Sequence, residues 1–327
     1  MKSLFIIAET ACSHDGSVDR LKKIIRNVVK SKFDAIQFQV WKHENIIDPL
    51  HKDKKILKKI QISYEDWVKI FQYTRKIGKI EIIACVYDLD AFNFCLKNNI
   101  SRFKIHASDI GNENLIKQIS KKAKRIDLSI GSTTISEISR AIKWIGKKTK
   151  VWLMYGYQLF PTNPNRLNLL YMNLLNKRFK KPIGYQDHSS FDISGFTIPT
   201  TAIGSGVNII EKHVTDYNKR KATDGESAIE ISDYKRFILK CRESQNSLGT
   251  NKFLKFSKDE IKYRKYSQKI IFFKNNLKKN STINIKDIVL LRSEKNGLRL
   301  DKLRNIIGKK LKKNVKQNEI LRLKDIS

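Results

Sequence analysis

Short apolar runs alternate with amphipathic stretches along the first three quarters of this chain. The apolar runs are rich in β-branched residues and predict eight strands, at 4–8, 34–40, 80–86, 102–106, 125–130, 150–155, 181–186 and 207–213. The stretches that follow them have helical periodicity, at 18–31, 64–77, 89–98, 112–122, 134–147, 165–178, 192–204 and 230–243. Regular alternation of strand and helix indicates an α/β fold with a parallel sheet.

The number of units favours one closed architecture. Eight strand–helix units within residues 1–245 match the size of a (β/α)8 barrel, the TIM barrel. The alternative is a doubly wound open sheet. No G-x-G-x-x-G follows the first strand, which disfavours the dinucleotide-binding version of that alternative.

The remaining residues have a different character. Residues 246–264 are polar and lysine-rich, and they predict a linker helix or loop. Residues 265–327 predict a small β-rich domain of two short strands, a polar turn and a brief helix near Ile285. Because about 60 residues bury only a modest core, we expect this tail to dock onto another surface.

The chain is strongly basic, with 66 Lys+Arg against 32 Asp+Glu and a formal net charge of +34. Such a charge fits either a nucleic-acid or anion-binding protein, or a lysine-rich composition without a special partner. The second interpretation is favoured, because the lysines are spread along the chain and no zinc module or aromatic RNA-binding signature is present. We therefore expect no nucleic-acid partner, but faster encounters with anionic substrates.

Cysteine usage and hydropathy bear on the compartment. The four cysteines show no C-x-x-C spacing, so reduced and mostly buried thiols are expected. No apolar run approaches the roughly 20 residues that span a bilayer, and the opening "LFIIAE" is too short for a signal peptide. A cytoplasmic protein without membrane contact is expected.

Polar side chains cluster where the predicted strands end. In a parallel barrel, these ends surround the active site. Read in order, they carry Glu9, Gln37 and Gln39, Cys85, Lys104, Ser129, Gln158, Gln186 and His188, and Glu211 and His213.

Two of the six histidines follow neighbouring strands, and this pattern suggests a metal site. His188 and His213 end the seventh and eighth strands, so their imidazoles could share one ion such as Zn, Mn, Fe or Ni. Two protein ligands leave positions open for water and substrate. Asp187 and Glu211 are candidates to orient the imidazoles. The alternative for each histidine is a structural role.

Three other strand ends have functional and structural interpretations. Lys104 could bind a phosphate or carboxylate, or could simply be solvated. Ser129 could donate a hydroxyl to an anion, or could form a turn. Glu9 ends an apolar strand, and a carboxylate buried there must be paired or protonated, which favours a functional role.

Several segments, in order, resemble the sialic acid synthases. "IAETACSHDGS" (7–17) is similar to the family's "IAEIGxNHxGS", "DAIQFQ" (34–39) to "DAVKFQ", and "FKIHASD" (103–109) to "YKIxSGE". "LSIGSTTISEI" (128–138), "GYQDHS" (184–189), "IIEKHVTD" (209–216) and "TDGESA" (223–228) also resemble family segments. Residues 290–326 are similar to the family's antifreeze-like (SAF) domain. The resemblance spans essentially the whole chain.

This resemblance implies a reaction and its residues. The family condenses phosphoenolpyruvate with an N-acetylated aminosugar and releases phosphate. It uses a divalent metal ion, and Mn or Mg is the ion expected here. By resemblance, His188 and His213 are the metal ligands and Glu9 is the acid/base residue. The phosphate contacts implied are Lys104 and Ser129, and the sugar-hydroxyl contact is Asp224. The substrate pocket would also hold Gln37, Gln39, Gln158, Phe160 and Gln186.

The same resemblance implies a homodimer in which the tail of one subunit lends Arg292 to the partner's barrel. Such an arrangement would explain why so small a tail exists, because it would cap the active site across the dimer.

Departures from the family pattern keep the donor substrate open. Gln37 stands in place of a second phosphate-binding lysine, Cys85 in place of a threonine, and Ala107-Ser108 in place of Ser-Gly. Gln158, Phe160 and Gln186 replace asparagine, tyrosine and serine. The favoured hypothesis is a nonulosonic acid synthase for surface polysaccharide, and two alternatives remain beside it. They are a diverged barrel enzyme with another donor or substrate, and a basic anion- or nucleic-acid-binding protein.

Overall fold

The computed structural model describes residues 3–216, 222–250, 252–253 and 255–327. It divides into two compact units, Met1–Thr250 and Asn251–Ser327. Across the described residues, no helix combines the length and apolar character needed to cross a bilayer.

The first unit is a closed barrel of eight parallel strands, as predicted. Each strand pairs with the next along the chain, and β1 also pairs with β8, which closes the sheet. The strands are β1 Phe5–Glu9, β2 Ala35–Val40, β3 Glu81–Val86, β4 Arg102–Ile105, β5 Arg125–Ser129, β6 Lys150–Tyr155, β7 Ile183–Asp187 and β8 Ile209–Thr215. The short β9 (Ala228–Glu230) adds to β8 in parallel.

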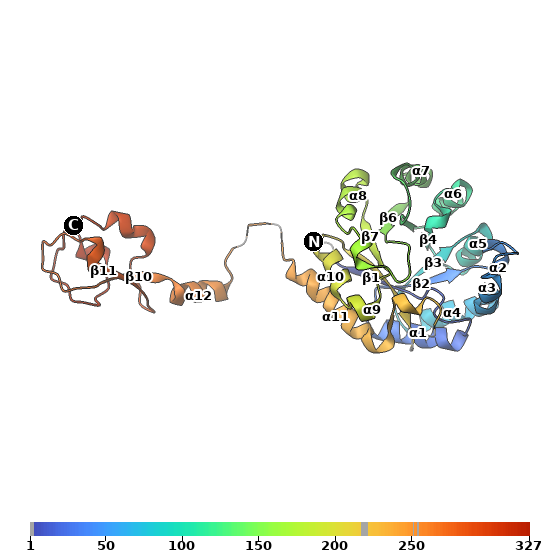
Figure 1. Cartoon of the computed structure of the whole chain (residues 1–327), viewed down its shortest axis with the longest axis horizontal. Coiled ribbons are helices and arrows are strands. Elements are labelled where there is room, and N and C mark those ends of the chain that lie inside the picture. Colours follow the sequence, from blue (N-terminus) through green and yellow to red (C-terminus); the bar gives the residue numbers. More distant parts are fainter. Residues whose placement is uncertain (1–2, 217–221, 251, 254) are drawn as a thin grey trace. The chain divides into compact units, whose positions relative to one another are not determined.

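Helices surround the strands (Figure 1). Their bounds are α1 Val18–Lys30, α2 His43–Ile46, α3 Lys54–Ile60, α4 Tyr64–Ile77, α5 Leu89–Lys97, α6 Glu113–Lys122, α7 Ile135–Ile145, α8 Tyr171–Phe179, α9 Phe191–Ser194, α10 Thr197–Gly204 and α11 Ile231–Ser247. Local sequence fixes several starts: Ser17 caps α1, and Thr134 with Glu137 forms a capping box at α7.

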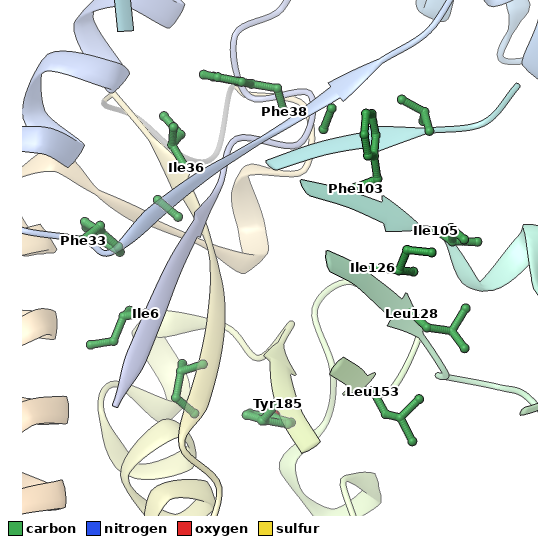
Figure 2. Close-up of a cluster of buried hydrophobic side chains, with 14 of the residues drawn as sticks. Ile6, Phe33, Ile36, Phe38, Phe103, Ile105, Ile126, Leu128, Leu153 and Tyr185 are labelled. Atoms are coloured by element: carbon green, nitrogen blue, oxygen red, sulfur yellow. The ribbon is translucent and has the colours of Figure 1, made fainter. Parts of the chain in front are cut away.

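The main core lies between the strands and the helices. Side chains on the outer face of the strands, such as Ile6, Ile36, Phe38 and Leu128, point toward the helix layer (Figure 2). They are fully buried, and each contributes about 1.5–3 kcal/mol relative to an exposed position. This outward set fixes the register, so the alternate residues must face the barrel interior.

The lower end of the barrel, where the strands begin, is filled by a charged and aromatic plug. The guanidinium of Arg125 lies 3.8 Å from the ring centroid of Trp152 and pairs with Asp127 at 2.7 Å and Glu81 at 2.5 Å. Above it, Ile7, Ala35, Ile83, Met154 and Ile209 form a buried apolar layer. The interior is therefore packed from the bottom up to the level of the strand ends.

The predicted elements differ from the structure in a few places. The helix predicted over 165–178 begins only at Tyr171, because Pro164–Arg166 forms a 3-10 turn and Asn168 has a left-handed φ of 45°. The helix predicted over 192–204 is interrupted at Gly195, where φ is +50°. The short elements α2, α3 and β9 were not predicted.

The second unit contains the two strands predicted for the tail. β10 (Lys269–Phe273) and β11 (Ile288–Arg292) pair antiparallel, and a 3-10 turn spans Ile285–Asp287. Ile271, Phe273 and Leu321 belong to a small core of their own. Helix α12 (Lys258–Ser267) covers part of the range predicted as a linker, and it begins at a capping box of Ser257 and Glu260.

Candidate active site

The upper part of the barrel interior is polar because of strand alternation. Two residues beyond the apolar layer, Ile7 leads to Glu9, Ala35 to Gln37, and Ile209 to Glu211. The same level receives Cys85, Lys104, Ser129 and Gln186, and all of these side chains are buried. The sequence therefore places a ring of polar groups directly above an apolar floor.

Lys104 lies between two carboxylates in this ring. Its Nζ is 2.6 Å from Oε1 of Glu211 and 3.7 Å from Oε2 of Glu9. Gln186 donates from Nε2 to the same Glu211 oxygen at 3.1 Å, and Ser129 donates to Oε1 of Gln186 at 2.9 Å. Ser129 thus reaches the lysine only through an amide and a carboxylate.

Burial and the neighbouring charges change the pKa of Glu9. Burial raises the pKa of Glu9 to about 8, Lys104 acts in the opposite direction, and Glu211 adds to the rise. The backbone N–H of Ala11 donates to Oε1 of Glu9 at 2.7 Å. Burial works against the charge of Lys104, but Glu211 and Glu9 raise its pKa overall. The ring therefore combines a carboxyl that holds its proton at neutral pH with a permanent cation.

His188 and His213 converge as the sequence predicts. Their ring centroids are 5.2 Å apart at an interplanar angle of 68°. Nδ1 of His188 lies 2.9 Å from the carbonyl oxygen of Tyr157 and must donate to it, so Nε2 of the neutral ring carries a lone pair. Burial lowers the pKa of His188 to about 4 and that of His213 well below its usual value. Both rings are neutral, the form that binds metals.

These two residues fit a divalent metal ion with open coordination positions. Among the described residues, no group of three His, Cys, Asp or Glu side chains is arranged to hold a metal. Two imidazoles alone leave several positions for water and substrate, as a catalytic site requires. Imidazole donors favour Mn, Fe or Zn over Mg.

The expected carboxylate partners of the histidines are elsewhere, and that prediction was wrong. Asp187 faces outward, since it is one residue from Gln186, and its carboxylate accepts from Ser189 Oγ at 2.6 Å and lies 3.0 Å from Lys212 Nζ. Glu211 is engaged with Lys104 and Gln186. The Tyr157 carbonyl orients His188 instead.

The loop after β6 covers the histidines. The ring centroid of Phe160 is 4.4 Å from that of His188 and 5.7 Å from that of His213. The backbone N–H of Thr162 donates to the carbonyl of His188 at 2.8 Å. A Cβ on Gly131 would clash with the backbone carbonyl oxygen of Gly156, so glycine is required for this loop to approach β5.

Asp224 reaches the site through a second set of loops. Its Oδ2 accepts from the backbone N–H of Cys12 at 3.4 Å, and burial raises its pKa. The neighbouring Thr223 donates its backbone N–H and its hydroxyl to Asp15, at 3.0 and 2.7 Å. Because Arg20 bonds Asp15 and also Asp216, at 2.6 Å for the latter, the loops after β1 and β8 are tied together.

A cavity of about 190 Å³ brings most of the predicted residues together. It is lined by the predicted Glu9, Gln39, Lys104, Gln158, Phe160, Gln186, His188, His213 and Asp224, and also by Tyr87 and His106. Two predicted residues lie deeper. Ser129 is buried behind Gln186, and Gln37 is fully buried, with neither side-chain polar atom hydrogen-bonded within the described chain. Arg292 ends β11 in the other unit and is exposed.

Tyr87 and His106 were missed because each lies just beyond the end of its strand. Tyr87 follows Cys85 by two residues and donates to Oε1 of Gln39 at 3.2 Å. His106 follows Lys104 by two residues. Extending the inward alternation past the last strand residue would have found both.

The buried His14 in the loop after β1 gives a prediction about acid stability. It accepts from the backbone N–H of Gly16 at 3.0 Å, and burial lowers its pKa from 6.5 to about 4. Between these values the unfolded chain binds a proton that the folded chain does not, so stability falls as pH falls through this window. The loss is up to about 3 kcal/mol.

Urea unfolding at pH 7.5 and 4.5 tests this prediction. Acidification should cost His14→Gln about 2–3 kcal/mol less than the parent chain. The exposed His51, changed to glutamine, is the matched control and should leave the acid sensitivity unchanged. Equal acid sensitivity of His14→Gln and the parent would contradict the assignment.

Comparison with known proteins finds a matching family model and relatives that align along nearly the whole chain. A family model described as "NeuB family" matches residues 24–253. The chain is 26% identical to N,N'-diacetyllegionaminic acid synthase of Campylobacter jejuni, over 98% of this chain and 100% of the relative. It is 24% identical to pseudaminic acid synthase of the same species, over 99% and 97%.

A solved structure agrees with the fold. The N-acetylneuraminic acid synthetase of Leptospira borgpetersenii, crystallised with citrate, superposes with a TM-score of 0.74 at 26% identity. The match covers 80% of this chain and 92% of that chain.

Proposed function

The chain belongs to the NeuB family of enzymes, and from that premise we propose that it condenses phosphoenolpyruvate with an N-acetylated aminosugar to a nonulosonic acid. C3 of phosphoenolpyruvate forms a bond to the aldehyde carbon of the open-chain sugar. Water adds to C2, and the C2–O bond to phosphate breaks, releasing inorganic phosphate. The product class serves surface polysaccharide synthesis.

One observation carries this proposal: two neutral imidazoles, a protonated carboxyl and a lysine line a single buried cavity. A divalent ion bound by His188 and His213 would supply Lewis-acid polarisation of the aldehyde oxygen, and Mn fits imidazole better than Mg. Lys104 binds the anionic donor. Glu9 holds a proton that can be delivered to the oxygen of the former aldehyde.

The amides and Asp224 fit the hydroxyl-rich part of the substrate. Gln39, Gln158 and Gln186 line the cavity and can both donate and accept hydrogen bonds. Phe160 covers the histidines and gives the sugar an apolar surface. The relatives named above are synthases of three different acids, so experiment must decide which of the three corresponding aminosugar precursors this chain uses.

Phosphate release tests the proposed reaction. Purified chain, Mn²⁺ and phosphoenolpyruvate are mixed with each N-acetylated aminosugar precursor, with a sugar-free blank as control. We expect release that depends on one sugar and stops on EDTA addition. Phosphate release that continues after EDTA addition would contradict the proposed dependence on a divalent metal ion. No release with any sugar would favour the diverged-donor alternative, which the substitutions Gln37, Cys85 and Ala107 also favour.

A homodimer with a shared site is a further part of the proposal, and it rests on the resemblance of the tail. Arg292 of one subunit would reach the pocket of its partner, where a guanidinium can grip hydroxyls or a carboxylate. Mixing the inactive variants Arg292→Ala and Glu9→Gln should restore part of the activity, because a hybrid dimer contains one intact site. No recovery after demonstrated subunit exchange would contradict this arrangement.

A further inference from the structure

His106 is a cavity residue with no role in the reaction described above. It follows Lys104 by two residues, and its ring lines the same cavity. The ring centroid lies 5.6 Å from that of Tyr87 at an interplanar angle of 37°. His106 is therefore placed beside the cation that binds the donor.

The backbone fixes which nitrogen of His106 faces a ligand. The N–H of Ser108 donates to Nδ1 at 3.3 Å, and an N–H can only donate, so Nδ1 is the acceptor. The Ser108 hydroxyl, 2.9 Å from Nδ1, donates to Asp109 at 3.2 Å. The neutral ring consequently carries its proton on Nε2, which is the nitrogen left for the cavity.

The imidazole is neutral before ligand binding. Burial lowers the pKa of His106 to about 4, and the neighbouring Lys104 lowers it further, while Glu211 opposes both. A neutral Nε2–H is a hydrogen-bond donor without a charge of its own. It can therefore coexist with Lys104 in a small cavity and still be directed at an anion.

The donor site needs such a group because its one lysine is already paired. Among the described residues that line the cavity, Lys104 is the one lysine or arginine. Its charge is balanced by Glu211, whose Oε1 lies 2.6 Å from Nζ. Gln37 occupies the position where the family has a second phosphate-binding lysine, and its side chain is buried away from the cavity lining. Ala107 offers no hydroxyl. A phosphoryl group bound here would therefore meet one cation, already paired, beside the neutral amides of Gln158 and Gln186.

We propose that His106 is a donor-recognition residue, whose Nε2–H binds the phosphoryl group of phosphoenolpyruvate beside Lys104. This inference rests on the proposed function, since it names the ligand of that site. The backbone N–H of Ser108 holds the imidazole in the tautomer that this role requires. The lost lysine and serine contacts are thereby replaced in part by one imidazole.

Binding measurements separate the phosphoryl group from the carboxylate. Isothermal titration of the full chain with Mn²⁺ uses three probes: phosphoenolpyruvate, inorganic phosphate and pyruvate. His106→Ala should weaken phosphoenolpyruvate and phosphate by about 10- to 100-fold, the effect of losing a hydrogen bond to a charged group, and leave pyruvate unchanged. His106→Gln, which keeps an N–H near the Nε2 position, should recover part of the affinity.

The controls separate this inference from the proposed function. His51→Ala removes an exposed imidazole and should change none of the three affinities. If the parent chain binds phosphoenolpyruvate and His106→Ala binds it equally well, the inference fails and the function stands. Weakened pyruvate binding would place His106 on the carboxylate and also overturn the inference. If the parent chain does not bind phosphoenolpyruvate, both proposals fail.

Discussion

Replacing Glu9 by glutamine should give a protein that is more stable than the parent chain and nearly inactive. The carboxyl is 1% exposed, and its pKa is raised from 4.5 to about 8. The unfolded chain loses this proton above pH 4.5 while the folded chain keeps it, so folding is penalised progressively as pH rises to 8. Glutamine removes that penalty, on the order of a few kcal/mol above pH 8, and can still accept the Ala11 N–H.

The activity of the same variant should fall by about 10²- to 10⁴-fold in kcat, since a positioned proton donor contributes that much. In the parent chain, kcat should decline as pH rises past 8, where Glu9 loses its proton. Thermal unfolding at pH 5 and pH 8.5 and a pH–rate profile are the measurements. A stability gain that is equal at both pH values would contradict the buried carboxyl as its cause.

Replacing Lys212 by methionine should strongly destabilise the barrel. Lys212 and Asp187 are both fully buried, 3.0 Å apart, and Lys212 also donates to the carbonyl of Ser189 at 2.7 Å. Removing the lysine leaves the buried Asp187 carboxylate without an opposite charge, although Ser189 still donates hydrogen bonds to it. We expect a loss of about 3–5 kcal/mol.

An exposed ion pair on α11 offers a matched control for this substitution. Lys240 lies 2.7 Å from Glu243, and about half of each side chain or more is exposed. Lys240→Met should change the free energy of unfolding by less than about 1 kcal/mol. Urea unfolding of both variants at pH 7 makes the comparison. Similar values for the two lysines would show that burial of the Asp187 pair carries no special cost.

The barrel was predictable because its strands are short apolar runs that recur along the sequence. Runs such as "LFIIA" and "DAIQFQV" combine β-branched residues with regular spacing, and helices with strong apolar periodicity follow them. The helix at 165–178 was overestimated because Pro164 allows both a helix start and a turn. The three-residue β9 has no local signal, since its strand geometry depends on pairing with β8.

The candidate site was predictable as a set of strand ends, but its contacts were not. Closure of the barrel brings Lys104 within 2.6 Å of Glu211, which is 107 residues away in the sequence. The same holds for His188, whose partner is a backbone carbonyl that no residue identity encodes. Asp187 was misassigned because it neighbours His188 in sequence, whereas strand alternation points it to the opposite face.

The plug of Arg125, Glu81 and Trp152 has a consequence for the order of events during turnover. With the lower end of the barrel packed, molecules enter and leave through the rim at the strand ends. If the proposed donor binds beside Lys104 and the sugar beneath Phe160, the donor lies deeper; it would then have to arrive first, and its phosphate could not depart past an occupied sugar position. Substrates would then bind in a fixed order through one entrance, and excess aminosugar is expected to inhibit the enzyme by blocking that entrance.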